Sequence, residues 1–217
     1  MKNNEQHLSK YTPAYEPLSL REPTPAEKRI DASLRVYMEK EMPLESDEKM
    51  MERDAILAEV RTIFLNWVKT VAIEVVHMPV EEAEDAGGEL FISGSHRLGV
   101  RDIGADIDTI CVAPNFCTRE HFFSSLKKEF LDRKEVSELV SVEDAFVPIM
   151  SFDFMGANGL NVSIDLLFAR MAENIVPKDI DILDDKILTG LDEATEKSLN
   201  GPRVTNMIFK LVGEKTF

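Results

Sequence analysis

Two aspartates, one residue apart, are the side chains of this sequence best suited to chemistry. Asp106 and Asp108 alternate with Ile107 in the segment G-A-D-I-D-T, and the chain then stays mostly apolar to Ala113. Successive side chains of a strand point to opposite faces, so the two aspartates would share a face with Cα atoms roughly 6.5 to 7 Å apart. Carboxylates at that spacing repel each other unless a cation lies between them, and Mg²⁺ accepts such oxygen ligands.

A glycine-serine turn precedes this pair. Ser93, Gly94 and Ser95 follow an apolar stretch that reads as a strand. Glycine lets the backbone approach a ligand closely, and a helix that begins there directs free N–H groups toward an anion. A pair of divalent ions roughly 3.5 to 4 Å apart is the usual arrangement for moving a phosphoryl or nucleotidyl group. Each feature alone is more often structural, but their succession on consecutive strands favours a nucleotidyl-transfer site.

A third aspartate lies in a predicted hairpin whose turn is G-A-N-G at residues 156–159. Asp165 lies between Ile164 and Leu166 in the second arm, where a carboxylate is costly to bury unless it is paired or bound to metal. We predict that Asp165 is the third carboxylate of the metal cluster. A structural carboxylate paired with an arginine is the alternative, and Asp153 in the first arm is the rival for the same place.

Several motifs together resemble the signature of eukaryotic nuclear poly(A) polymerases, members of the DNA polymerase β-like nucleotidyltransferase superfamily. The motifs are G-S-x-R-L-G-V from Gly94, G-A-D-I-D-T from Gly104, D-A-F-V-P-I from Asp144, S-I-D-L-L-F-A-R from Ser163 and S-L-N-G-P-R-V-T from Ser198. The glycine-serine and D-x-D pair marks only the superfamily, whereas the whole series is specific to the poly(A) polymerase branch. The resemblance covers most of the chain from about Pro23 onward.

This resemblance implies a function. The chain would add AMP from ATP to the 3′ end of RNA without a template, using two Mg²⁺ or Mn²⁺ ions. Its partners would be ATP, the RNA 3′ end and other 3′-end processing proteins, and it would be located in the nucleus. The catalytic and metal-binding residues would be Asp106, Asp108 and Asp165. The ATP-binding residues would be Ser93, Gly94, Ser95, Asp102, Asp106, Ile107, Asp108, Asp165 and Asn200, and the RNA-binding residues Phe146 and Ser151. For Phe146 a core aromatic, and for Asn200 a cap at a helix break, are equally open interpretations.

Departures from the family pattern bear on RNA binding. Ser93 stands where the family commonly has an aromatic residue, and Asp102 adds negative charge beside the triphosphate position. Ser151 and Asp153 stand where relatives often carry lysines that hold RNA. The chain has a net charge of −15, whereas a protein that grips a phosphate backbone normally shows a basic face. Nucleotide with metal is therefore a better ligand for this chain than polynucleotide.

The predicted elements and the family resemblance together imply an α/β (α+β) fold, a mixed sheet of four or five strands flanked by helices. The 217 residues are 44% hydrophobic and 30% charged, with no apolar run long enough for a bilayer. Cys111 and Cys117 read as buried free thiols. Helices are predicted over 26–42, where Thr24 is the cap, from 47 through an apolar stripe to Val71, and over 119–131. Strands are predicted from Glu89, through Asp106 and Asp108, and over 139–142, 146–154 and 160–169. A solvated acidic loop is predicted over 81–88, and C-terminal helices interrupted at 200–202.

The expected domains are an extended or partly disordered arm over 1–25, a nucleotidyltransferase domain over 26–180, and the start of a helical middle domain over 181–217. Family enzymes continue through that middle domain and an RNA-binding domain. Two interpretations of different class follow: a poly(A) polymerase catalytic domain that is cut short or completed by another subunit, and a short paralogue that binds metal–nucleotide or a processing partner without polymerising. An enzyme of the same fold with another nucleotide or a small acceptor is a third.

Overall fold

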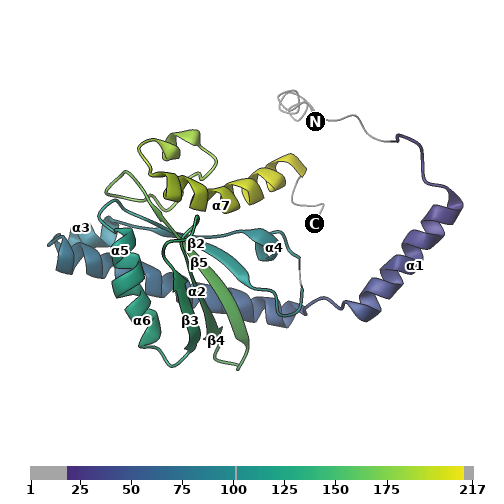
Figure 1. Cartoon of the computed structure of the whole chain (residues 1–217), viewed down its shortest axis with the longest axis horizontal. Helices are drawn as coiled ribbons and strands as arrows, with labels where there is room; N and C mark the ends of the chain where they lie inside the picture. Colours follow the sequence, from purple (N-terminus) through teal and green to yellow (C-terminus); the bar gives the residue numbers. More distant parts are fainter. Residues whose placement is uncertain (1–18, 101, 213–217) are drawn as a thin grey trace.

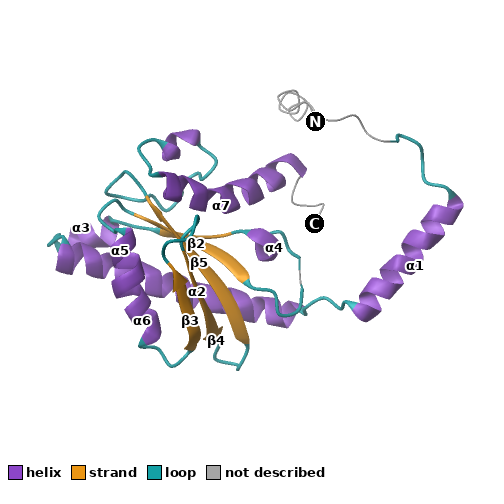
Figure 2. Cartoon of the chain, viewed as in Figure 1, coloured by secondary structure: helices purple, strands orange, loops and turns teal. Residues whose placement is uncertain are grey.

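A mixed β-sheet lies at the centre of the computed structural model, which describes residues 19–100 and 102–212 (Figures 1 and 2). In this part of the chain the sheet has five strands in the order β1-β2-β5-β4-β3. The strands are β1 (Glu89–Ile92), β2 (Ile107–Ala113), β3 (Val136–Val142), β4 (Ile149–Met155) and β5 (Asn161–Arg170). Strands β2 and β5 run parallel, and the other neighbours are antiparallel. The predicted mixed sheet with flanking helices is confirmed.

The two long N-terminal helices begin where the sequence provides caps. Their bounds are α1 (Pro25–Glu41), α2 (Asp47–Thr70) with a π-helical extension (Val71–Val75), α3 (Val80–Asp85), α4 (Gly94–Arg97), α5 (Arg119–His121), a π-helical stretch (Phe122–Leu126), α6 (Lys127–Leu131), a 3₁₀ turn (Asp185–Leu188) and α7 (Glu193–Val212). The Thr24 side chain accepts the Glu27 N–H at the start of α1, and the Glu27 carboxylate accepts the Thr24 N–H in return. Ser46 caps α2 through the Lys49 N–H. Both caps satisfy N–H groups that a helix leaves free in its first turn.

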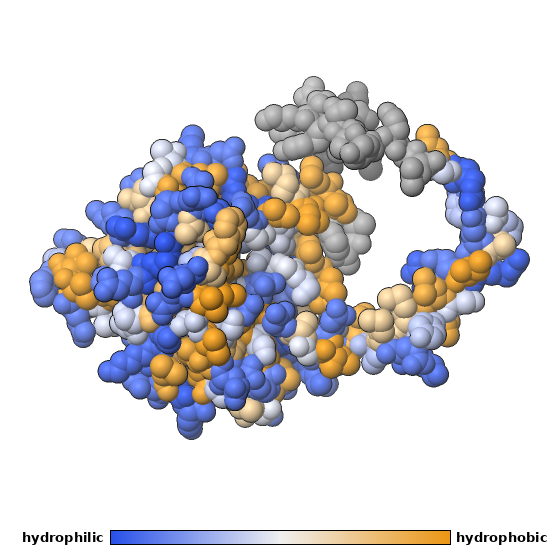
Figure 3. All heavy atoms as spheres, viewed as in Figure 1, coloured by the Kyte–Doolittle hydropathy of each residue, from blue (hydrophilic) through white to orange (hydrophobic). Residues whose placement is uncertain are grey.

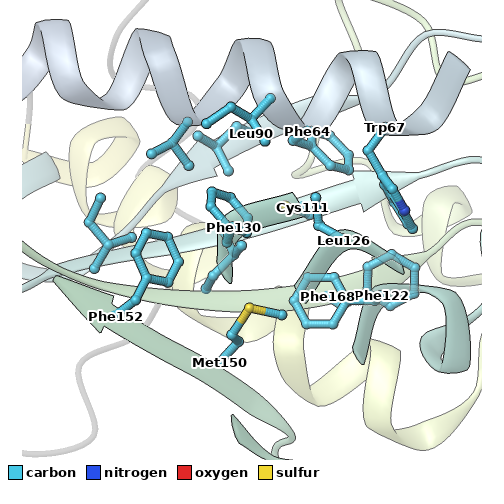
Figure 4. Packing of buried hydrophobic residues seen from close by; sticks show 14 of the residues in the cluster. Phe64, Trp67, Leu90, Cys111, Phe122, Leu126, Phe130, Met150, Phe152 and Phe168 are labelled. Carbon is cyan, nitrogen blue, oxygen red and sulfur yellow. The ribbon is translucent and has the colours of Figure 1, made fainter. Parts of the chain in front are cut away.

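The main core lies between α2, the helical segment 119–131 and one face of the sheet. Phe64 and Trp67 project from α2 onto this face in Figure 4, and Trp67 is fully buried. The Trp67 indole N–H donates to Ser125 Oγ at 2.8 Å, which satisfies its polar end. Phe168 of β5 packs edge-on against Trp67. The predicted apolar stripe of α2 is therefore confirmed, and Cys111 is a buried free thiol of the same core, as expected.

Helix α7 covers part of the opposite face of the sheet, and here one prediction was wrong. The sequence Asn200-Gly201-Pro202 was expected to interrupt the helix, but α7 runs through it. Leu199, Pro202 and Thr205 are buried at three-residue spacing. Leu199 belongs to an apolar cluster with Ile110 of β2. Burial of this face outweighs the hydrogen bond that proline cannot donate and the low helix propensity of glycine.

Three element boundaries also differ from expectation. The acidic segment 81–88 was predicted as a solvated loop, but residues 81–85 belong to α3. Ala83 of this helix is buried against the body of the protein. Strand β4 begins at Ile149, so Phe146 lies in the preceding turn. Asp106 lies just before β2 and not within it.

Helix α1 stands apart from the sheet and buries none of its residues (Figure 1). Ile30, Leu34 and Tyr37 are among its exposed side chains. Figure 3 shows hydrophobic surface on this projecting helix. Most of the predicted arm, residues 1–18, lies outside the described residues, and the domain boundary at 181 stays a prediction. None of the described helices combines the length and apolarity needed to cross a bilayer.

Candidate active site

The register of the sheet places two of the predicted aspartates side by side. Asp108 of β2 lies opposite Asp165 of the parallel strand β5. Neighbouring strands lie about 4.8 Å apart, and residues in register point to the same face. Ile107 and Ile164 are buried in the core on one face, whereas Asp108 and Asp165 are half-buried on the other. Two carboxylates that are 57 positions apart in the sequence thus become neighbours.

Asp106 completes a negatively charged group. It is exposed in the loop immediately before β2. Burial raises the pKa of Asp108, and the charges of Asp106 and Asp165 raise it further. Both effects disfavour the ionised form of Asp108, so a cation bound here would relieve an unfavourable concentration of negative charge.

The donor atoms and the available space fit a hard divalent cation. All three side chains offer carboxylate oxygens, which Mg²⁺ and Mn²⁺ prefer. In the described residues, no group of three or more His, Cys, Asp or Glu side chains is arranged to hold a metal ion by itself, so a bound ion would need ligands from its substrate or small shifts of these side chains. Gly94 lies against the Asp108 carboxylate: its φ is +64°, and an added Cβ would lie 2.1 Å from Asp108 Oδ2. Glycine at this position therefore keeps the space beside the carboxylate open.

The glycine-serine turn is fixed by β2 and α7. The Ser93 N–H donates to the Asp108 carbonyl at 2.9 Å, and the Ser93 side chain is buried next to Gly201 of α7. The Gly94 N–H donates to Thr205 Oγ1 at 3.3 Å. This amide therefore has a partner within the protein, and Gly94 does not supply one of the free N–H groups that were expected to face an anion. Ser95 follows it, half-buried, in α4.

Helix α7 contains one residue predicted to contact a ligand, Asn200, and touches a second, Phe146. Asn200 is an exposed residue within α7, so its interpretation as a cap at a helix break was wrong. Phe146 is 76% exposed, which excludes the core-aromatic interpretation. The ammonium of Lys197 lies 3.4 Å from the centre of the Phe146 ring, a cation–π contact that joins α7 to the turn before β4. The ATP and RNA roles of Asn200 and Phe146 stay predictions.

The two rival carboxylates lie on neighbouring strands, Asp165 on β5 and Asp153 on β4. Ser151 pairs with Asp165 in the sheet, and its hydroxyl donates to Asp165 Oδ1 at 2.6 Å. Asp153 pairs with Ser163 one step further along, and it accepts hydrogen bonds from Ser163 Oγ at 2.5 Å and Asn161 Nδ2 at 2.9 Å. Asp165 therefore lies in the row of Asp108, whereas Asp153 does not. Ser151, predicted to contact RNA, here orients a carboxylate.

Two contacts escaped the sequence reasoning. Arg53 of α2 is 3% exposed and donates to the Ala105 carbonyl at 2.7 Å, directly before Asp106. It lies three residues before Ile56, so its position on the buried stripe of α2 was a usable signal. Thr205, which holds the Gly94 amide, is the last residue of the motif S-L-N-G-P-R-V-T.

Asp102 lines the same niche between α2 and α4 as Ser95 and Asp106. Asp102 itself is exposed, and its backbone forms an antiparallel bridge with Leu44. The niche is too narrow to admit a water molecule. Its place beside Asp106 is compatible with the predicted ATP contact of Asp102, which stays a prediction.

Comparison with known proteins identifies the family of the chain. The family model described as poly(A) polymerase nucleotidyltransferase domain matches residues 15–212. The chain is 38% identical over 196 residues to poly(A) polymerase pla1 of Schizosaccharomyces pombe, covering 90% of this chain and 34% of that protein. It is 40% identical over 197 residues to nuclear poly(A) polymerase 4 of Arabidopsis thaliana, covering 90% of this chain and 26% of that protein.

Among solved structures, Cid1 in complex with the UTP analogue UMPNPP aligns with a TM-score of 0.45 and 18% identity, over 67% of this chain and 37% of that chain. This alignment is too loose to add to the assignment. The chain thus spans between a quarter and about a third of the two poly(A) polymerases. The family model, in contrast, accounts for nearly all of it. The chain belongs to the poly(A) polymerase nucleotidyltransferase domain family.

Proposed function

We propose that this chain transfers AMP from ATP to the 3′-hydroxyl of RNA, with Mg²⁺ or Mn²⁺ as cofactor. The observation that carries the proposal is the register pairing of Asp108 with Asp165, beside Gly94 and next to the charge of Asp106. Oxygen ligands side by side on two adjacent strands suit divalent ions that carry a nucleoside triphosphate. Because the chain spans only part of its relatives, the activity of the whole enzymes is part of this proposal.

The residues have distinct roles in this scheme. Asp106 and Asp108 hold the metal-bound triphosphate, and Asp165 faces the attacking hydroxyl. When bound, two divalent ions would neutralise charge on the phosphates and lower the pKa of that hydroxyl. Asp165 has one oxygen engaged by Ser151, so Oδ2 accepts the hydroxyl proton. The 3′ oxygen then bonds to the α-phosphorus, and the bond to the leaving pyrophosphate breaks.

The remaining predicted contacts belong to the two substrates. Gly94 keeps the space beside Asp108 open, and the exposed ring of Phe146 is available to stack on a base at the RNA end. The other residues proposed to line ATP are Ser93, Ser95, Asp102, Ile107 and Asn200, and Ser151 would lie near RNA. Binding of other 3′-end processing proteins is inferred from the family, and a nuclear location from relatives, three of which are named as nuclear.

A second function differs in class: binding of metal–nucleotide without polymerisation. The net charge of −15 favours it. So does Asp153, an acid on the sheet face that carries Asp165. A negative surface repels the phosphates of an RNA primer but not a nucleotide whose charge is neutralised by metal.

The test is primer extension with labelled ATP, an oligo(A) primer and either Mg²⁺ or Mn²⁺. Polyadenylation predicts a ladder of extended primer that Asp108→Asn abolishes. Asp153→Asn is the matched control, because it removes a carboxylate of the same sheet face outside the proposed centre, and it should leave the ladder intact. Binding of ATP with Mn²⁺ but no extension would favour the second function. Extension that survives in Asp108→Asn would reject the assignment of the site.

A further inference from the structure

The loop between α4 and β2 carries Asp106 but has little packing of its own. Val100 is 45% exposed and Ile103 is 59% exposed. A Cβ added at Gly99 or Gly104 would meet nothing within 4 Å. The described side chains of the loop therefore do not fix its position against the body of the protein. The backbone of the loop is held at Asp102 by its bridge to Leu44, but Asp106 lies four residues further on. A metal site tolerates ligand displacements of only about 0.2 Å, so Asp106 needs an anchor closer to it.

Helix α2 supplies a buried anchor. Arg53 is 3% exposed and Glu45 is 5% exposed, and the Arg53 Nε donates to Glu45 Oε2 at 2.7 Å. A second nitrogen of the same guanidinium donates to the Ala105 carbonyl at 2.7 Å. Ala105 and Asp106 share a peptide bond, so this contact fixes the backbone at the residue that carries the exposed carboxylate.

We propose that Arg53, locked in place by Glu45, is a positioning residue that sets the place of Asp106 beside Asp108. The proposal rests on the proposed function, because it concerns the same metal centre. A planar guanidinium can bond two partners in fixed directions, which an ammonium cannot. A buried charge that loses its partner is strongly unfavourable, so Glu45 keeps the arginine from turning away.

The competing explanation is that the ion pair only stabilises α2, and the experiment has to separate the two. The double variant Glu45→Gln/Arg53→Met removes both charges, so that neither is left buried without a partner. The matched control is Arg61→Met/Glu89→Gln. It removes a two-bond ion pair, at 2.8 and 2.9 Å, by which the same helix holds β1 rather than the loop. The parent and both variants are compared for amide hydrogen exchange of residues 102–106 and for binding of Mn²⁺ alone, by electron paramagnetic resonance of the free ion.

The anchor predicts exchange at residues 102–106 about tenfold faster in the Glu45/Arg53 variant, and Mn²⁺ affinity about 10-fold weaker, because orienting partners of a metal ligand contribute 10- to 100-fold to affinity. The Arg61/Glu89 variant should match the parent in both. Parent-like exchange and affinity in the Glu45/Arg53 variant would overturn the proposal, and so would equal changes in the control.

If the double variant does not fold, Arg53→Lys replaces it. Lysine keeps the charge beside Glu45 but lacks the fork that also reaches Ala105. Faster loop exchange in a folded Arg53→Lys protein supports the anchor, and parent-like exchange rejects it. If the parent itself binds no Mn²⁺, the proposed function fails, and the exchange data alone then decide whether Arg53 anchors the loop.

Discussion

Replacing Gly94 by alanine tests how closely the turn and the Asp108 carboxylate depend on each other. The new Cβ would lie 2.1 Å from Asp108 Oδ2, whereas such contacts are essentially never shorter than 3.0 Å. The carboxylate therefore has to move by about 0.9 Å or the turn has to shift. The left-handed backbone at φ +64° adds a strain of about 1–2 kcal/mol for a residue with a side chain. A displacement of this size is several times the tolerance of a metal ligand.

The assay for Gly94→Ala is a Mn²⁺ titration, supported by thermal unfolding. We expect Mn²⁺ affinity to fall about 10- to 100-fold, the range for loss of a group that orients a ligand. Gly159→Ala is the control, because Gly159 has a φ of +83° but nothing within 4 Å of its added Cβ. The Gly159→Ala variant should carry the same backbone strain but bind Mn²⁺ as tightly as the parent. Parent-like Mn²⁺ affinity in Gly94→Ala, or an equal loss in Gly159→Ala, would refute the reasoning.

Three further predictions concern the carboxylates and the core. The raised pKa of Asp108 stabilises the fold only at low pH, and this contribution is lost as pH rises through the folded pKa. Without metal, the melting temperature of Asp108→Asn should therefore exceed that of the parent at neutral pH, and the difference should narrow toward about pH 4 in a series of unfolding curves. Equal melting temperatures at neutral pH would contradict this prediction. Ser151→Ala removes the 2.6 Å hydrogen bond to Asp165 and should weaken Mn²⁺ binding about 10-fold in the same titration; unchanged binding would mean that Ser151 does not orient the ligand. Trp67→Ala should lower the free energy of unfolding by about 3–5 kcal/mol in urea, because it empties a fully buried site; a loss below about 1 kcal/mol would contradict that packing.

Local patterns were sufficient to predict much of the fold. The stripe of α2 and the cap at Thr24 depend on residues within a few positions of each other, so the sequence displays them directly. The same is true of β5, where alternation separates the buried Ile164 from Asp165. Tertiary packing overrode local signals elsewhere: Pro202 reads as a helix breaker, but the apolar face of α7 rests on the sheet and the helix continues.

The candidate site was only partly predictable, for a related reason. Its aspartates stand in recognisable motifs, but their adjacency depends on strand register, which no short segment encodes. The contacts that hold the site join residues far apart: Arg53 and Ala105 are separated by 52 positions, and Gly94 and Thr205 by 111. Residue type at one position does not identify such a partner. Local pattern also misplaced Phe146: this aromatic residue was expected in a strand, but it is exposed in a turn.

The most direct test of the account counts Mn²⁺ ions bound per chain in the presence of a non-hydrolysable ATP analogue. If Asp106, Asp108 and Asp165 form one centre, the parent should bind two ions. Asp165→Asn should lose at least one of them, whereas Asp153→Asn should keep both, because Asp153 is hydrogen-bonded within its own strand pair. An Asp165→Asn protein that binds as many ions as the parent would contradict the claim that the paired strands build the metal site.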